Sequence, residues 1–136
     1  IKSDYLNNVN ASMQSGEVNI EEQSLLRVDS ASKVNYVGSL LYERIRDFHI
    51  KNGVIMFGEN TIFIDADVEI ESGVVIYPNN VILGNSFIES GACILQGNTI
   101  KNSIISNGGK VENSFIEKSK ITSSLPPKSI VIGEEK

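Results

Sequence analysis

Isoleucine returns at every sixth residue through the middle of the chain, and this spacing most constrains the fold. The residues are Ile64, Ile70, Ile76, Ile82, Ile88, Ile94 and Ile100. An α-helix repeats its apolar face every three or four residues and a β-strand every two, so neither explains the period. The spacing predicts a left-handed parallel β-helix, in which each six-residue unit supplies one strand and one corner and three units close a coil.

The same spacing predicts which residues share a face of the coil. Stacking by three units places Ile64, Ile82 and Ile100 on one face, Ile70 and Ile88 on a second, and Ile76 and Ile94 on the third. Two residues earlier in each unit, a mostly smaller inward side chain is expected near the corner; these are Val68, Val74, Ser86, Ala92 and Asn98, with Ile62 at the mouth of the coil. The spacing then shortens to five or six residues at Ile105, Val111, Ile116 and Ile121.

A row of serines follows from this register. Ser86, Ser103 and Ser119 should lie above one another and could hydrogen-bond along the axis. We interpret the row as structural, because equivalent residues of successive repeats stack on one another and the sequence offers no general base to activate a hydroxyl. Pro126 and Pro127 cannot donate to a strand ladder, so they predict the end of the coil.

Three segments are expected along the chain. Residues 1–29 are weakly structured, with a short helix suggested by Leu6, Val9 and Met13 and a strand alternation at Val18 and Ile20. Residues 30–53 form a linker helix, capped by Ser30 and stopped by Asn52-Gly53. Its apolar stripe runs through Val34, Val37, Leu41, Ile45 and Phe48. Residues 54–136 form the β-helix and a closing segment.

Several residues predicted to face outward are apolar, which a solvated face does not require. They are Phe63, Val81 and Phe115 on the first face, Phe87 and Ile104 on the second, and Val75 and Cys93 on the third. Apolar patches of this kind mark a contact surface. We expect the linker helix to cover one face and a second subunit to cover another.

Composition excludes some functions. The formal charge is −5 and the chain has no cluster of Lys and Arg, which argues against nucleic acid as a partner. No apolar run approaches the length of a membrane span. Cys93 is the only cysteine, so no internal disulfide can form, and the chain fits a reducing cytoplasm. Because the chain begins at Ile1 rather than Met, we expect further sequence upstream.

Candidate chemistry is sparse. His49, the only histidine, is interpreted as a surface or interface residue near a helix C-terminus, where its charged form is favoured. Asp65, Asp67, Glu69 and Glu71 could approach a hard cation, but solvated corner residues are the preferred interpretation. Cys93 lacks a neighbouring group that would activate it. The run of residues 107–110 is too short for a phosphate loop.

Three stretches carry a resemblance to a known family. They are residues 44–54 (RIRDFHIKNGV), 59–70 (ENTIFIDADVEI) and 75–78 (VIYP). They resemble the junction of the bacterial bifunctional N-acetylglucosamine-1-phosphate uridyltransferase and glucosamine-1-phosphate acetyltransferase, over about residues 30–121. The resemblance implies a helix that links a nucleotidyltransferase domain to a trimeric β-helix that uses acetyl-CoA. It also allows residues 1–29 to be a remnant of that domain. A looser resemblance, through the Asn-Ser-x-Ile units, is to the β-helix of glucose-1-phosphate adenylyltransferases.

Neither active site of that family is visible in this sequence. The Gly-rich nucleotide loop with Arg and Lys is absent, and the acetyltransferase residues belong to later coils. We therefore predict no catalytic and no metal-binding residues here. The ending at residues 125–133 resembles the closing phrase of hexapeptide acyltransferases, which implies a natural C-terminus on a short β-helix rather than an enzyme cut in mid-coil.

The leading hypothesis is the oligomerising, trimeric part of a sugar nucleotidyltransferase-like protein, with a sugar nucleotide bound through an upstream domain. The alternatives are an acetyltransferase that uses acetyl-CoA between subunits, and a non-enzymatic structural trimer.

Overall fold

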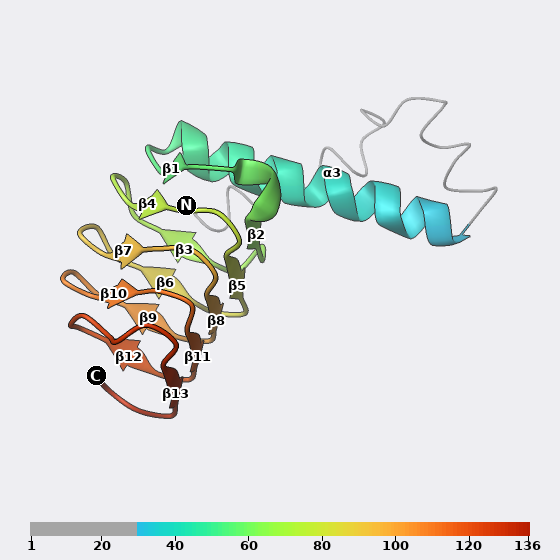
Figure 1. Ribbon diagram of the computed structural model, residues 1–136. Helices are drawn as coiled ribbons and strands as arrows, with labels where there is room; N and C mark the ends of the chain where they lie inside the picture. Colours follow the sequence, from blue (N-terminus) through green and yellow to red (C-terminus); the bar gives the residue numbers. More distant parts are fainter. Residues whose placement is uncertain (1–29) are drawn as a thin grey trace. The chain divides into compact units, whose positions relative to one another are not determined.

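The computed structural model describes residues 30–136 (Figure 1). The helix predicted from Leu6, Val9 and Met13 and the strand predicted at Val18 and Ile20 lie outside the described residues. The chain divides into two compact units, and the boundary falls between Arg44 and Ile45, inside the helix.

Helix α3 spans Ser30–Lys51 and is followed by short strands and one 3-10 turn, η1 (Glu59–Thr61). The strands are β1 (Ile55–Met56), β2 (Phe63–Ile64), β3 (Glu69–Ile70), β4 (Val75–Ile76), β5 (Val81–Leu83), β6 (Phe87–Ile88), β7 (Cys93–Ile94), β8 (Thr99–Lys101), β9 (Ile104–Ile105), β10 (Lys110–Val111), β11 (Phe115–Glu117), β12 (Lys120–Ile121) and β13 (Ile130–Ile132). Consecutive strands lie in different sheets. The described strands therefore wind as a coil rather than folding back as hairpins.

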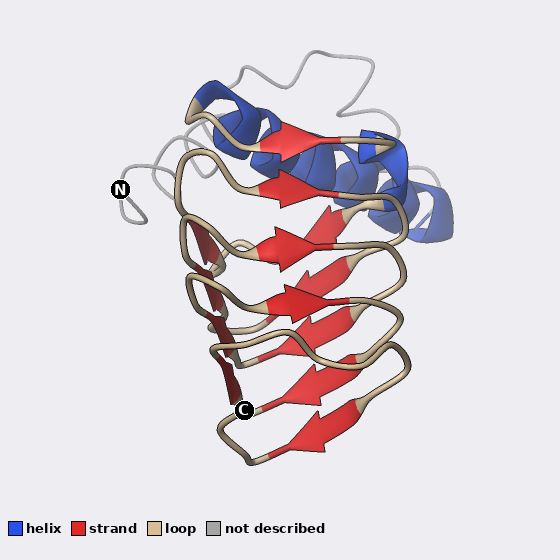
Figure 2. Ribbon diagram, turned by 60° about the vertical axis from the view of Figure 1, so that its left-hand side comes forward, coloured by secondary structure: helices blue, strands red, loops and turns tan. Residues whose placement is uncertain are grey.

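Three parallel sheets form the sides of a left-handed β-helix of about five coils (Figures 1 and 2). Sheet A has the strand order β1-β4-β7-β10, sheet B has β13-β11-β8-β5-β2, and sheet C has β12-β9-β6-β3. This architecture confirms the fold class predicted from the isoleucine spacing.

The pairing of strands confirms the predicted register. Ile64 pairs with Ile82 and Ile82 with Ile100 in sheet B. Ile70 pairs with Ile88 in sheet C, and Ile76 with Ile94 in sheet A. The predicted outward residues fall on the expected sheets as well, since Phe63 pairs with Val81, Phe87 with Ile104 and Val75 with Cys93.

The core is a set of stacked isoleucines along the axis. All the predicted axis residues from Ile76 to Ile121 are fully buried, and so is Ile64. Ile70 is the exception and is half-buried. It lies in β3, the terminal strand of sheet C, and has a stacking partner on one side only, whereas Ile64 is buried although its strand β2 is likewise terminal in sheet B.

Two of the corners are held by rows of polar side chains. Ser86 Oγ accepts the Ser103 N–H at 3.2 Å, and Ser103 Oγ accepts the Ser119 N–H at 3.1 Å. The predicted stacking of these serines is therefore confirmed. A second row, not predicted from the sequence, begins at Asn80, whose Oδ1 accepts the Nδ2–H of Asn98 at 3.0 Å. Asn98 Oδ1 in turn accepts the Ser114 N–H at 3.0 Å.

Helix α3 ends as its sequence predicts. Gly53 has a left-handed φ of 94°, and its N–H donates to the Ile50 carbonyl at 3.1 Å. The Val54 N–H donates to the His49 carbonyl at 3.0 Å. These two bonds form a Schellman motif, in which glycine takes the left-handed position without a Cβ penalty.

The predicted burial of the helix stripe holds only toward its C-terminal end. Val34 is exposed, Val37 and Leu41 are half-buried, and Ile45 is buried. From Ile45 onward, the helix packs against the first coil, where Arg46 Nη1 donates to the Ile62 carbonyl at 3.2 Å.

The prediction that the coil ends at Pro126-Pro127 is wrong. Strand β13 follows the prolines and pairs in parallel with β11, with Val131 next to Ile116. The prolines lie in a corner between two strands, where no ladder N–H is required, so they do not interrupt the winding.

Candidate functional site

His49 is buried, which corrects its interpretation as a surface residue with a favoured charge. The side chain is only 3% exposed, and its ring meets that of Phe48 edge-on at 5.3 Å. Burial lowers the pKa of His49 from 6.5 to about 4. Desolvation of the imidazolium therefore outweighs the stabilisation that a helix C-terminus offers a cation. At neutral pH the imidazole is uncharged and shielded from any soluble substrate.

The acidic residues of the first coil act partly as acceptors for backbone N–H groups of the second coil. Asp65 Oδ2 accepts the Gly84 N–H at 2.9 Å, and Glu71 Oε1 accepts the Ser90 N–H at 2.8 Å. Within residues 30–136, no group of three or more His, Cys, Asp or Glu side chains is placed to hold a metal ion. Asp65 and Glu71 thus tie two successive coils together at their corners.

The other singled-out residues lie in structural positions. Cys93 is half-buried on the outer side of sheet A, between Val75 and Lys110. In the run of residues 107–110, Gly108 takes a left-handed φ of 88° and Lys110 begins β10. This run forms a corner of the coil.

Apolar outer residues gather on two of the three sheets. On sheet B, the outer column is Phe63, Val81, Thr99, Phe115 and Ile130. On sheet A, Ile55 pairs with Val75 and Val75 with Cys93, and the exposed ring of Phe57 lies 5.4 Å from that of Tyr77. On sheet C, the outer column has charged residues at both ends, Glu69 and Lys120, and two apolar residues between them, Phe87 and Ile104. Sheets A and B are therefore the candidate contact faces.

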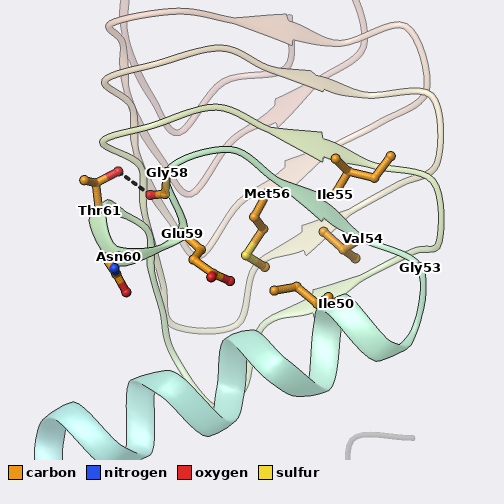
Figure 3. A pocket seen from close by; sticks show the side chains of 9 residues that line it. All are labelled: Ile50, Gly53, Val54, Ile55, Met56, Gly58, Glu59, Asn60 and Thr61. Carbon is orange, nitrogen blue, oxygen red and sulfur yellow. Dashed lines mark hydrogen bonds between the residues drawn. The ribbon is translucent and has the colours of Figure 1, made fainter.

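A hollow of about 890 Å³ lies where the helix end meets the first coil (Figure 3). It is lined by Ile50, Gly53, Val54, Ile55, Met56, Gly58, Glu59, Asn60 and Thr61. Figure 3 shows Met56 and Glu59 extending from the coil toward the helix, and Ile50 rising from the helix toward them. Thr61 Oγ1 donates to the Gly58 carbonyl at 2.7 Å and accepts the Asn79 N–H at 2.9 Å.

Neither this hollow nor the role of Asn80 was predicted from the sequence. Asn80 lies two residues before Ile82, the same offset that identified Asn98, so the register could have identified it. The hollow depends on how the helix end meets β1 and η1. No local pattern in the sequence encodes that junction.

No α-helix among residues 30–136 combines the length and apolar character that a membrane crossing requires.

The fold and its two apolar faces define a parallel β-helix protein with a helical segment before the first coil. No family model matches the chain. Among curated proteins, it is similar to the bifunctional protein GlmU of Clostridium acetobutylicum, with 33% identity over 106 residues. The GlmU proteins of Clostridium beijerinckii and Clostridium novyi are 35% and 29% identical over the same length.

Each of these matches covers 78% of this chain and 23% of the relative. The chain thus spans about a quarter of the length of the curated relatives it matches. The similarity confirms the resemblance seen in the sequence: this chain, over most of its own length, is related to the bifunctional GlmU family.

Proposed function

We propose that this chain is the oligomerising β-helical part of a GlmU-related, sugar nucleotidyltransferase-like protein, and that it associates with copies of itself, as a trimer. The observation that carries the proposal is the apolar outer column of sheet B. Ile130 is 73% exposed and Phe115 is 37% exposed, although both side chains are large and apolar. Covering such a column removes apolar surface from water, at about 25 cal/mol per Å².

Sheet A supports the same proposal with a second apolar face. Ile55 and Phe57 are both exposed there, and Val75 is half-buried. A chain with two different apolar faces can associate by a heterologous contact, in which one face of each copy meets the other face of the next. Heterologous contacts form rings when the rotation between successive copies closes, and a trimer is the smallest such ring; otherwise they form open filaments.

Mutations on the outer sides of two sheets test the proposal. Phe115 and Ile104 are matched, because each is 37% exposed and points outward, from sheet B and sheet C respectively. We expect sedimentation velocity to show a trimer for the wild type and for Ile104→Asp, and a monomer for Phe115→Asp. A monomeric wild type, or a trimer that survives Phe115→Asp, contradicts the proposal.

We further propose that the chain does not contain a complete active site, and that sugar-nucleotide chemistry belongs to an upstream domain in the cytoplasm. The burial of His49 supports this, since the only imidazole of the chain cannot reach a substrate. Thermal-shift titrations with acetyl-CoA and with UDP-N-acetylglucosamine test it. We expect no shift with either compound, and a saturable shift with acetyl-CoA would favour the acetyltransferase alternative.

A further inference from the structure

The hollow at the helix end combines apolar walls with a single charged group. Ile50, Val54, Ile55 and Met56 supply the apolar lining, and Glu59 is the only ionisable side chain among the lining residues. Methionine adapts its shape to different occupants more readily than branched side chains do. The hollow can therefore receive an apolar stem and place one polar head group beside a carboxylate.

The Glu59 carboxylate brings a negative charge to the hollow, and Lys51, the basic residue in the last turn of α3, is not among the residues that line it. The negative end of the α3 dipole adds to this field, because Ile50 and Gly53 belong to the helix C-terminus. A neutral or anionic head group would gain little in this field, whereas a cation would gain a carboxylate partner.

We propose that this hollow is a docking site for a lysine or arginine side chain presented by a partner protein. Such side chains have the required form, since they bury an apolar stem and keep a charged head near polar groups. The stem lies along Ile50, Val54 and Met56, and the head pairs with the Glu59 carboxylate. A charge-assisted hydrogen bond in this position fixes the orientation of the partner segment.

The probe is a short labelled peptide with one central arginine flanked by leucines. A second peptide carries citrulline in place of arginine, which keeps the shape and hydrogen-bonding groups but removes the charge. Binding is measured on the full chain by ¹H–¹⁵N chemical-shift titration, which gives both the dissociation constant and the residues that respond. We expect shifts centred on Ile50, Met56 and Glu59, and binding about tenfold weaker for the citrulline peptide.

Two variants separate the site from the general field. Glu59→Gln removes the carboxylate of the hollow, and Glu89→Gln makes the same change of net charge on a residue that does not line it. We expect Glu59→Gln to weaken binding of the arginine peptide about tenfold and Glu89→Gln to weaken it less than twofold. Ile50→Ser, a change at a partly exposed wall residue, should weaken both peptides alike.

Three results overturn the proposal: no binding of the arginine peptide at millimolar concentration, equal binding of the citrulline peptide, or equal effects of Glu59→Gln and Glu89→Gln. The first shows that the hollow takes no cationic side chain, and the other two show that the Glu59 carboxylate does not recognise the charge.

Discussion

Two buried serines three residues apart should respond to the same mutation with opposite signs. Ser103 and Ser106 are both buried, but only the first has a hydrogen-bonded hydroxyl. Ser103 Oγ donates to the Lys101 carbonyl at 2.8 Å and accepts the Ser119 N–H at 3.1 Å. Ser106 Oγ is buried and has no hydrogen-bond partner among the described residues. The pair therefore compares a satisfied buried hydroxyl with an unsatisfied one in neighbouring corners.

The size of the effect follows from the groups left behind. Ser103→Ala leaves the buried N–H of Ser119 without its acceptor, which costs about 1–3 kcal/mol. The Lys101 carbonyl loses less, because it also accepts the Lys118 N–H. We expect Ser103→Ala to lower the free energy of unfolding by about 2 kcal/mol. Ser106→Ala removes a desolvated hydroxyl that makes no bond, so we expect it to raise that free energy by about 0–1 kcal/mol.

Urea unfolding monitored by circular dichroism measures both variants against the wild type. The protein concentration must be the same in all three experiments, because association with other copies would contribute to the apparent stability. The m-value should stay constant, so that a shift of the midpoint reports stability alone. Equal destabilisation by both mutations would refute the reasoning. It would show that loss of packing volume, rather than hydrogen-bond satisfaction, decides the stability of the corners.

Three further predictions concern single side chains. Because the pKa of His49 is about 4 in the native chain and 6.5 when the chain is unfolded, the unfolded chain binds a proton between pH 6.5 and 4 that the native chain does not. The free energy of unfolding should therefore fall by about 3 kcal/mol as the pH decreases across this window. Urea unfolding of His49→Phe should lack that fall. Lys118 has a left-handed φ of 50°, which glycine adopts without the penalty of a Cβ. Lys118→Gly should therefore raise the free energy of unfolding by about 0.5–1 kcal/mol, and the melting temperature with it. Lys120→Gly, within strand β12, should lower the melting temperature. Arg46→Met keeps the apolar stem but removes the donor to the buried Ile62 carbonyl, and denaturant unfolding should show a loss of about 1 kcal/mol.

The repeat predicts the fold so well because each isoleucine reports the same local geometry. One residue in six must point to the axis, and stacking then fixes which units pair, as Ile82 with Ile64 and Ile100 shows. The shortened units that end at Ile105, Ile116 and Ile121 keep the register because the residue is lost from a corner, not from a strand. Hydrophobic spacing therefore determines strand, face and partner together.

The errors arise where a residue's role depends on its position between elements. Pro126 and Pro127 were expected to end the coil, but a corner needs no ladder N–H, so proline is tolerated there. His49 was expected at a surface or interface because it lies near the helix C-terminus, where a charged imidazole is favoured; the packing of the helix end against the first coil buries it instead. The hollow beside Glu59 comes from the same junction. Such tertiary features leave no periodic trace in the sequence.

The two proposed contact surfaces lie on different parts of the β-helix and can be tested separately. Phe115 is on the outer side of sheet B in the later coils, whereas Glu59 lies in the 3-10 turn of the first coil. If both proposals hold, Phe115→Asp should abolish self-association and leave peptide binding unchanged, and Glu59→Gln should weaken peptide binding about tenfold and leave self-association unchanged. Loss of both properties in either variant would mean that the hollow is completed by a neighbouring copy. The basic side chain that fills it would then come from the oligomer itself, and the cationic residues of helix α3, such as Lys33 and Arg44, would be the first to mutate.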